Sequence, residues 1–441
     1  MTETKITEQD LKELRAAYEK NPTNAILERT VTQNGIGNVS YDETATEKLN
    51  PVFSVEVKTG KVSNQKQSGR CWMFALLNTL KHQFGAKYNV KDFELSQNYL
   101  FFWDKIERAN IFYDRIVNTA DKPLDDRTVQ YFLEVGPGAD GGQWAMAVAL
   151  VQKYGVVPTT AFSETNVSES TGDLKAILNY KLRNDAFKLR NMVNDGVSEE
   201  DIHDAREQML AEVYKIAAYS LGVPPKTFDF EYRDDNDNYH IDRDLTPKAF
   251  YEKYLSDADL DDYVVLSNSP DKEYDKMYRL SAQENVVDGR KIEFLNLPME
   301  DLKNVAIAQL KDGQAVWFAN DIARQSDRKK GFLAENLYHY DELFDVDLSM
   351  SKKERLQYHE ANVSHATALT GVDLVDDKPT KWKVENSWGS KNGVNGYFIM
   401  DDDWMNEYVY EIVINKKYLS NDKIALLSQS PVELAPWDSL E

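Results

Sequence analysis

Cysteine is nearly absent from this sequence, because 441 residues contain one, Cys71. A single cysteine excludes a disulfide bond within the chain. Long apolar runs are also missing, and no stretch approaches the ~18 residues that a membrane-spanning helix needs. The first twenty residues are charged and hydrophilic, so they predict no signal peptide. We therefore expect a cytoplasmic protein that does not span a membrane.

Positive charge is scarce as well. Lysine and arginine number 52 against 74 aspartates and glutamates, which gives a net charge of −22. A surface of this sign repels the phosphates of nucleic acids and anionic lipids. The one basic run, Arg328-Lys329-Lys330, is interpreted as a solvated loop. Nucleic acid is therefore disfavoured as a partner.

Two motifs lack what a cofactor or metal site would need. The glycine cluster over residues 136–142 has neither the spacing of a phosphate-binding loop nor the Lys-Ser/Thr that follows one. The acidic turn over residues 234–238 lacks the central glycine and the closing glutamate of a calcium loop, so it indicates a hairpin turn. We expect no metal and no cofactor.

The chain is otherwise typical of a globular protein, with 42% hydrophobic and 11% aromatic residues. Its length fits two or three domains, or one large domain with insertions. Apolar spacing predicts helices over residues 6–20, 72–84, 97–106, 143–154, 173–221 and 298–313. Alternation predicts a hairpin over 228–241 and strands over 316–318, 365–372, 381–385, 396–400 and 408–414. Helices come before strands, which indicates an α+β fold.

Cys71 lies where a reactive cysteine would be placed. Ser68 and Gly69 suit the entry to the apolar helix, so Cys71 falls in or just before its first turn. A thiol there is close to the positive end of the helix dipole, which favours the nucleophilic thiolate. The alternative is that Cys71 is simply a small buried residue.

A cysteine nucleophile needs a base, and histidine is the best one near neutral pH. Five of the six histidines are interpreted as structural or solvated: His82, His203, His240, His339 and His359. His365 differs because it opens an apolar strand between two small residues. Asn386 follows another strand, where its amide oxygen would hold the imidazole while the indole of Trp388 shields that bond from water. Ordinary packing remains the alternative for each residue alone.

Together these motifs resemble the papain-like cysteine peptidases, and among them the bleomycin hydrolase/aminopeptidase C branch. The resemblance is carried by Gln65, Ser68-Gly69-Arg70-Cys71-Trp72, Leu95-Ser96-Gln97, Gly141-Gly142, Ser364-His365-Ala366, Asn386-Ser387-Trp388-Gly389 and Gly396-Tyr397-Phe398. In ordinary papain-like enzymes the histidine follows the cysteine by roughly 130–150 residues. Here the separation is about twice as long, as the insertions of that branch imply.

The resemblance implies a papain-like two-lobed α+β fold with a helical lobe that carries the cysteine, an antiparallel, barrel-like β lobe that carries the histidine and asparagine, and a large helical insertion. The corresponding segments are 1–60 (N-terminal wrapping segment), 61–165 (helical lobe), 166–350 (mainly helical insertion and oligomerisation region), 351–430 (β lobe) and 431–441 (C-terminal arm). It also implies a homohexamer with peptide substrates.

Site roles follow from the same resemblance. It implies Cys71 as nucleophile, His365 as general acid and base, Asn386 as the residue that orients His365, and Gln65 as the oxyanion-hole side chain. Gly141, Gly142, Trp388 and Glu441 are the implied substrate-binding residues. Glu441 ends an arm in the cleft, where a carboxylate would hold the free amine of the substrate.

These features predict an aminopeptidase that acts by thiolate attack and an acyl-enzyme intermediate. Asp438 and Glu441 depart from the small neutral residues expected at this position of an aminopeptidase, so an endopeptidase on the same scaffold is the alternative. A nucleic-acid-binding member of the family and a catalytically idle scaffold are further alternatives. The net charge argues against the first, and the intact set of Gln65, Cys71, His365 and Asn386 against the second.

Overall fold

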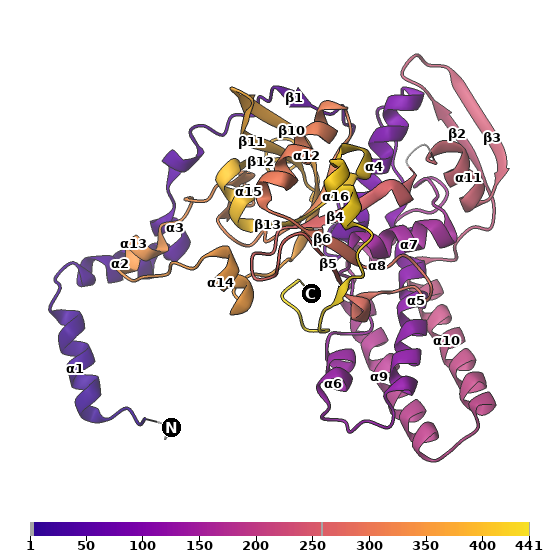
Figure 1. Cartoon of the computed structure of the whole chain (residues 1–441), viewed down its shortest axis with the longest axis horizontal. Coiled ribbons are helices and arrows are strands. Elements are labelled where there is room, and N and C mark those ends of the chain that lie inside the picture. The colour runs from indigo at the N-terminus through magenta and orange to yellow at the C-terminus, as the bar shows by residue number, and fades with distance from the viewer. Residues whose placement is uncertain (1–3, 257–258, 441) are drawn as a thin grey trace.

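The protein folds into two packed lobes, and an N-terminal arm projects from them (Figure 1). The structure is a computed structural model that describes residues 4–256 and 259–440. Helices dominate the lobe at the right of Figure 1, and a sheet with a few helices forms the lobe at its centre. This segregation of helices and strands confirms the predicted α+β class.

The helical lobe is organised around α4 (Cys71–Tyr88), which is apolar on nearly all sides. The helices of this lobe are α4, α5 (Gln97–Asn118), α6 (Arg127–Glu134), α7 (Trp144–Tyr154), α8 (Asn166–Glu169), α9 (Gly172–Asn194), α10 (Glu199–Leu221) and α11 (Pro247–Tyr254). A helix without a polar face is stable only where other elements cover it. Most of α4 is accordingly buried, and its first residue is fixed at the edge of the core.

The predicted hairpin is formed by β2 (Phe228–Arg233) and β3 (Tyr239–Leu245), which pair antiparallel. Its turn is closed by the carboxylate of Asp234, which accepts the backbone N–H groups of Asn236 and Asn238 at 3.0 and 2.9 Å. Such side-chain caps are what Asp and Asn provide in tight turns.

The β lobe holds one large sheet, which has twelve strands within the described residues. Eleven of them follow the order β14-β5-β6-β4-β13-β7-β10-β11-β12-β9-β8, and β1 pairs with β10. The strands are β1 (Val55–Glu56), β4 (Tyr263–Ser267), β5 (Lys276–Arg279), β6 (Glu293–Asn296), β7 (Val316–Asn320), β8 (Ser326–Asp327), β9 (Phe332–Leu333), β10 (His365–Val375), β11 (Lys378–Glu385), β12 (Tyr397–Asp401), β13 (Val409–Asn415) and β14 (Val432–Glu433).

The central strands of this sheet are buried on both faces, one against the helical lobe and the other within the β lobe. In β7, Trp317 and Ala319 join the core of the helical lobe, whereas Val316 and Phe318 join the second core behind the sheet. This is the two-residue alternation of a strand buried on both faces. β10 pairs antiparallel with β7 and β11, so the start of β10 lies beside the end of β11.

The remaining helices link the strands of the sheet, and some of them pack on its outer face, whereas the short helix over residues 340–344 lies beside residues 36–40. They are α12 (Met299–Lys311), α13 (Tyr340–Phe344), α14 (Lys352–Gln357), α15 (Asp402–Tyr408) and α16 (Asn421–Leu426), with short 3₁₀ turns η1 (Glu43–Thr46), η2 (Leu260–Asp262), η3 (Ser281–Gln283) and η4 (Lys416–Tyr418). The apolar side of α12 packs on the sheet through Leu302, Ala306 and Leu310. These side chains belong to the second core, on the side of the sheet away from the helical lobe.

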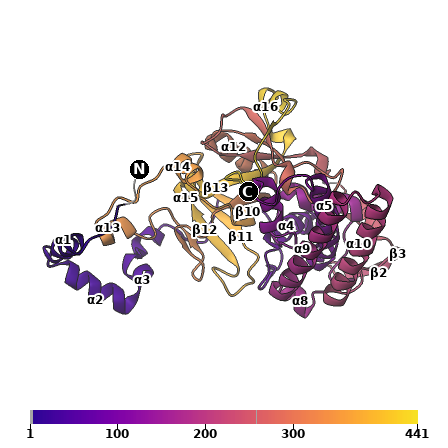
Figure 2. The ribbon, with the colours of Figure 1, turned by 90° about the horizontal axis from the view of Figure 1, so that it is seen from below.

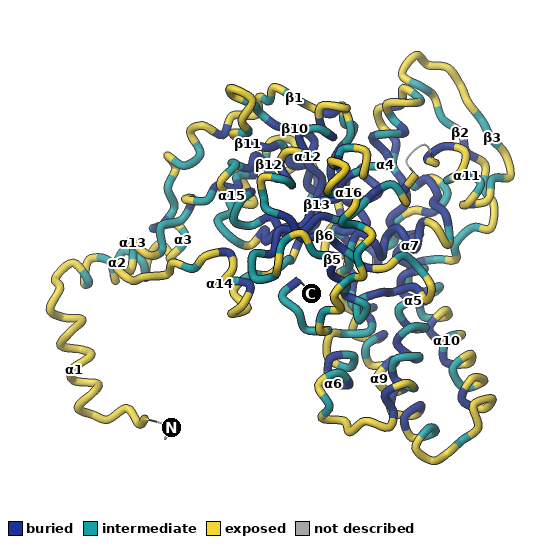
Figure 3. The backbone as a smooth tube through the Cα atoms, in the orientation of Figure 1, coloured by how far each residue is buried: buried dark blue, intermediate teal, exposed yellow. Residues whose placement is uncertain are grey.

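The N-terminal arm extends away from both lobes (Figures 1 and 2). It consists of α1 (Glu8–Glu19), α2 (Asn24–Asn34) and α3 (Ile36–Ser40), and α1 begins with a capping box between Thr7 and Asp10. Figure 3 shows α1 exposed on all sides. The exposed apolar side chains of the arm are Ile6, Leu11, Leu14, Tyr18, Ile26 and Ile36.

The predicted insertion over residues 166–350 contributes more than helices and a hairpin. It supplies α9 and α10, and it also supplies β4 to β9 of the large sheet. Strands before and after residue 350 therefore share one sheet. In the described ranges no helix is long and apolar enough to cross a membrane.

Candidate active site

Cys71 is the first residue of α4, and its side chain is partly buried at the junction of the two lobes. Burial raises the pKa of the Cys71 thiol, although the backbone N–H groups of Ala366 and Trp72 favour the thiolate. The helix start therefore has the predicted effect on the thiol, but burial outweighs it. Ala366 lies on β10, so the thiol meets the β lobe directly at the start of that strand.

The loop before Cys71 is held by Arg70, whose side chain is fully buried. Its guanidinium donates to both carboxylate oxygens of Glu164, at 3.0 and 2.7 Å, and to the carbonyl of Ser168 at 2.8 Å. A bidentate pair of this kind fixes orientation as well as distance. Sequence reasoning missed Glu164, because nothing in its local sequence marks it as a partner of a residue so far away.

His365 is the first residue of β10, and its ring lies against Asn386 and Trp388. The imidazole Nε2 lies 3.1 Å from Asn386 Oδ1, which also accepts the backbone N–H of Ser387 at 2.7 Å. Because that oxygen is an acceptor, Nε2 donates, and Nδ1 is left for another partner. The indole of Trp388 stacks on the ring at a centroid distance of 4.8 Å.

Burial lowers the pKa of His365 to about 4, and the positive charge of Arg328 acts in the same direction. The hydrogen bond to Asn386 opposes this shift. Burial thus disfavours both the imidazolium and the Cys71 thiolate when each is alone. Cys71 and His365 line the same cavity, so opposite charges on the two side chains would favour each other there.

Gln65 is fixed through both ends of its side-chain amide. Nε2 donates to the carbonyl of Ser68 at 2.6 Å, and Oε1 accepts the hydroxyl of Ser387 at 2.5 Å. The side chain is nevertheless part of the cavity wall beside Cys71. Since a primary amide has two N–H donors, one remains available to an oxygen in the cavity.

Gly141 and Gly142 lie opposite the β lobe, and their surroundings differ. A Cβ on Gly142 would lie 2.8 Å from the indole of Trp72, which is fully buried. A Cβ on Gly141 would have no atom within 4 Å. Gly142 is therefore required by packing, whereas Gly141 leaves its backbone open to the cavity. The indole itself is fixed by donating to the carbonyl of Asp140 at 2.7 Å.

These parts meet in one cavity of about 460 Å³ between the lobes, which we call the cleft. Of the predicted site residues, it is lined by Gln65, Cys71, Gly141, Gly142, His365 and Trp388. Asn386 is buried behind His365. Among the described residues no group of His, Cys, Asp and Glu could hold a metal ion.

The C-terminal segment reaches the edge of the cleft. The carbonyl of Leu440 accepts a hydrogen bond from Gln143 Nε2 at 3.3 Å, and the Leu440 side chain is buried. Asp438 forms an ion pair of 2.9 Å with Lys272. Glu441, the predicted amine-binding residue, lies outside the described residues. The structure thus places the backbone of Leu440 beside Gln143, the residue that follows Gly141 and Gly142.

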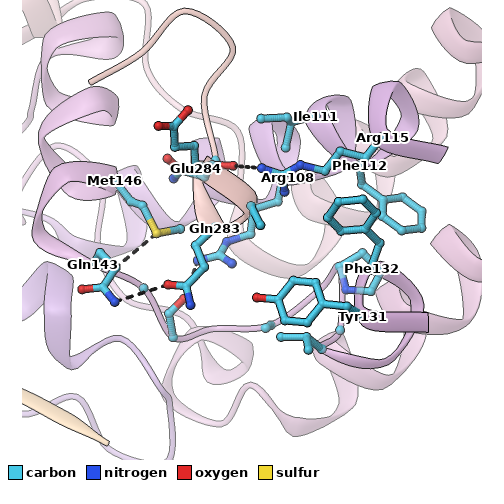
Figure 4. Close-up of a pocket in the computed structure, with 18 of the residues that line it drawn as sticks. Arg108, Ile111, Phe112, Arg115, Tyr131, Phe132, Gln143, Met146, Gln283 and Glu284 are labelled. Atoms are coloured by element: carbon cyan, nitrogen blue, oxygen red, sulfur yellow. Dashed lines mark hydrogen bonds between the residues drawn. The ribbon is translucent and has the colours of Figure 1, made fainter. Parts of the chain in front are cut away.

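A second cavity of about 320 Å³ opens beside this end of the cleft, between α5 and α6 (Figure 4). It shares Gly141, Gly142, Gln143 and Val363 with the cleft. Figure 4 shows the rings of Tyr131 and Phe132 on one side of it and Gln143, bonded to Gln283 at 3.3 Å, on the other. We call it the α5–α6 cavity.

Two charged groups near the site went unrecognised in the sequence. Arg328 is exposed, as expected for the basic run, yet it lines the cleft beside Trp388. Glu385 precedes Asn386 and is buried, with His82 at 2.5 Å and Lys81 at 3.6 Å. His82 is therefore a buried hydrogen-bond partner of Glu385, consistent with its structural interpretation. This pair can be recognised only when the position of β11 relative to α4 is known.

A cysteine at the start of the central helix of one lobe, in one cavity with a His–Asn pair on the sheet of the other, is the arrangement typical of a papain-like cysteine peptidase. Comparison with known proteins supports the same class. The family model described as "Peptidase C1-like family" matches residues 5–441. The chain therefore belongs to the Peptidase C1-like family, and the predicted resemblance is confirmed.

Relatives in this family match nearly the whole chain. Aminopeptidase G of Lactobacillus delbrueckii subsp. lactis is 52% identical over 435 residues, which cover 99% of both chains. Aminopeptidase C of the same organism is 46% identical over 426 residues, which cover 96% of this chain and 94% of the relative. The crystal structure of PepW from Lactobacillus rhamnosis HN001 superimposes with a TM-score of 0.96 at 49% identity, over 99% of both chains.

Proposed function

We propose that this protein is a cysteine aminopeptidase that removes N-terminal residues from peptides. The observation that carries the proposal is the convergence of Cys71, the His365–Asn386 pair and Gln65 in one cleft, with the backbone of Leu440 at its edge. Family membership and the names of the relatives agree with it.

The residues divide the chemistry among them. His365 takes the proton of Cys71, and the thiolate attacks the carbonyl carbon of the scissile peptide bond. Gln65 Nε2 and the backbone N–H of Cys71 bind the oxygen that becomes negative. The imidazolium then protonates the leaving amine, and the acyl-enzyme forms as the C–N bond breaks. A water molecule, deprotonated by His365, hydrolyses the thioester and restores the thiol.

The arm supplies the preference for a free amino terminus. Glu441 follows Leu440, and we assign its negative charge to the capture of the substrate's protonated amine. A fixed anion at a set distance from the thiol selects the bond after the first residue. Gly141 lets the substrate backbone approach, because its position has no side chain to fill the cleft.

One pair of peptides tests this proposal against the endopeptidase alternative. The peptides are identical except for an N-terminal acetyl group, and mass spectrometry follows the products. We expect stepwise shortening of the free peptide and no cleavage of the acetylated one. Internal cleavage of the acetylated peptide would keep the catalytic residues and assign an endopeptidase. Cys71→Ser is the inactive control, since the change is nearly isosteric.

The proposed assembly is a homohexamer in the cytoplasm. It is supported by the arm, whose exposed apolar residues, Leu11, Leu14 and Tyr18 among them, lie on a helix that does not touch the lobes (Figure 3). Light scattering should give the mass of six chains of 50.6 kDa each. Leu14→Asp should lower that mass, and an unchanged mass would exclude the arm from the interface.

A further inference from the structure

A basic pocket of about 500 Å³ opens beside the cleft. It is lined by Asn64, Lys66, Arg328, Lys329, Trp388 and Asn392. Arg328 and Trp388 line both the pocket and the cleft, so the two spaces lie next to each other. A group bound in this pocket can therefore belong to a molecule whose reacting bond lies at Cys71.

The basic pocket and the C-terminal arm lie at different ends of the cleft. The α5–α6 cavity meets the cleft at Gly141, Gly142, Gln143 and Val363, and Gln143 binds the carbonyl of Leu440. The basic pocket shares none of these residues. Since the arm is assigned to the amino end of the substrate, the basic pocket faces the half of the peptide that leaves.

The cations of this pocket are unpaired. Within the described ranges no carboxylate forms an ion pair with Lys66, Arg328 or Lys329, although acidic residues outnumber basic ones in the chain. Lys330, the third residue of the same basic run, instead bonds to Glu43 at 3.3 Å. Three cations left together in an acidic protein make a local site for an anion.

The wall of the basic pocket is held by hydrogen bonds. The backbone N–H of Lys66, which has a φ of +54°, donates to Asn64 Oδ1 at 2.9 Å. The carbonyl of Lys329 accepts the N–H of Gly393 at 3.1 Å, and Asn392 Nδ2 donates to the carbonyl of Trp388 at 2.9 Å. Both lysines therefore project from anchored backbone.

Distances suggest which part of a peptide reaches this pocket. The guanidinium carbon of Arg328 lies 6.0 Å from the centre of the Trp388 indole, which lies 4.8 Å from the centre of the His365 ring. Two extended residues span roughly 7 Å, and a charged hydrogen bond adds about 3 Å. The two distances put the guanidinium no farther than about 11 Å from the imidazole, which a carboxylate on the second residue after the scissile bond can reach.

We propose that the basic pocket binds a carboxylate on the leaving half of the substrate, so that the enzyme favours tripeptides with a free C-terminus. This inference rests on the proposed peptidase function. The carboxylate can come from the C-terminus or from an acidic side chain at the same position, and the experiment separates the two sources.

The test uses three peptides with the same first two residues and a free amine. The third residue is neutral with a free C-terminus, neutral with a C-terminal amide, or glutamate with a C-terminal amide. For the native protein we expect kcat/KM to be roughly tenfold higher for the free acid than for the neutral amide, the range of one charged hydrogen bond. The ratio should shrink in high salt.

Arg328→Gln together with Lys66→Gln should bring that ratio close to one. Lys330→Gln is the matched control, since it removes a charge from the same loop outside the pocket, and the ratio should stay at its native value. If the glutamate peptide behaves like the free acid, the pocket binds carboxylates from either source; if it behaves like the neutral amide, the C-terminus is the ligand.

Equal rates on all three peptides would overturn the pocket assignment while leaving the peptidase function in place. The same holds if the double variant keeps the native preference. Failure to shorten any of the peptides would instead contradict the proposed function itself. The two failures are therefore distinguishable.

Discussion

Replacing Gln65 by alanine should abolish most activity without disturbing the fold. The amide of Gln65 is held at both ends by Ser68 and Ser387, and its free N–H belongs to the wall of the cleft. A donor fixed before the reaction needs no reorganisation when the negative oxygen forms. Gln65→Ala therefore removes transition-state stabilisation and little ground-state binding.

The expected loss is about 10²- to 10³-fold in kcat, or roughly 2.7–4 kcal/mol, which is typical of one oxyanion-hole donor. KM should change little. Ser387→Ala removes one of the two contacts that hold the amide, so we expect a smaller loss of about tenfold, the worth of one hydrogen bond to stability or orientation.

The assay is steady-state hydrolysis of a tripeptide, with circular dichroism to verify folding. Gln67→Ala is the matched control, because this neighbouring glutamine is exposed and does not line the cleft. A fall in kcat of less than tenfold for Gln65→Ala, with the protein folded, would refute the assignment of this side chain to the oxyanion hole.

Four further variants test packing and protonation. Gly142→Ala should destabilise the protein by about 1–3 kcal/mol, because the new Cβ meets a buried indole. Gly141→Ala should leave stability unchanged and raise KM, because its Cβ enters the open cleft; urea unfolding and kinetics distinguish the two. Arg70→Ala should lower the free energy of unfolding by about 3 kcal/mol, since it leaves a carboxylate without its buried partner. In Cys71→Ser, where no thiolate can form, stability should fall by up to about 3 kcal/mol between pH 6.5 and pH 4, because burial lowers the pKa of His365 to about 4.

The sign of the pH effect follows from the direction of the shift. The unfolded chain binds a proton at His365 near pH 6.5, and the folded chain does so only near pH 4. Stability from this group is therefore complete above pH 6.5 and lost as the pH falls to 4. Adding His365→Asn to Cys71→Ser should remove this part of the pH dependence; parallel curves for the two proteins would contradict it.

Equal stabilities of the Gly141→Ala and Gly142→Ala variants would show that the Trp72 indole does not limit the packing of this loop. An Arg70→Ala protein as stable as the native one would mean that the buried ion pair contributes no net stability.

The features that could be predicted are those set by local sequence patterns. The apolar period of α4 and the small residues before it place Cys71 at a helix start, and alternation places His365 at the start of a strand. The motifs around Cys71, His365 and Asn386 lie where helices and strands begin or end, and together they indicate one family. The fold class, the family and the peptidase activity are accordingly confirmed.

The features that could not be predicted depend on contacts between segments that lie far apart in the sequence. Glu164 is identified as the partner of Arg70 only when α4 and the residues before α8 are in place. The thiol pKa depends on burial between lobes, which outweighs the local helix effect. Arg328 belongs to a run that reads as solvated loop, and its position at the cleft depends on how β8 and β9 join the sheet.

Alkylation of the single thiol tests the central claim most directly. Because the chain has one cysteine, iodoacetamide incorporated at that thiol reports on Cys71 alone. We predict one label per chain at neutral pH, loss of peptide hydrolysis in proportion to labelling, and much slower labelling in His365→Asn. Full peptidase activity after complete alkylation would show that the nucleophile lies elsewhere.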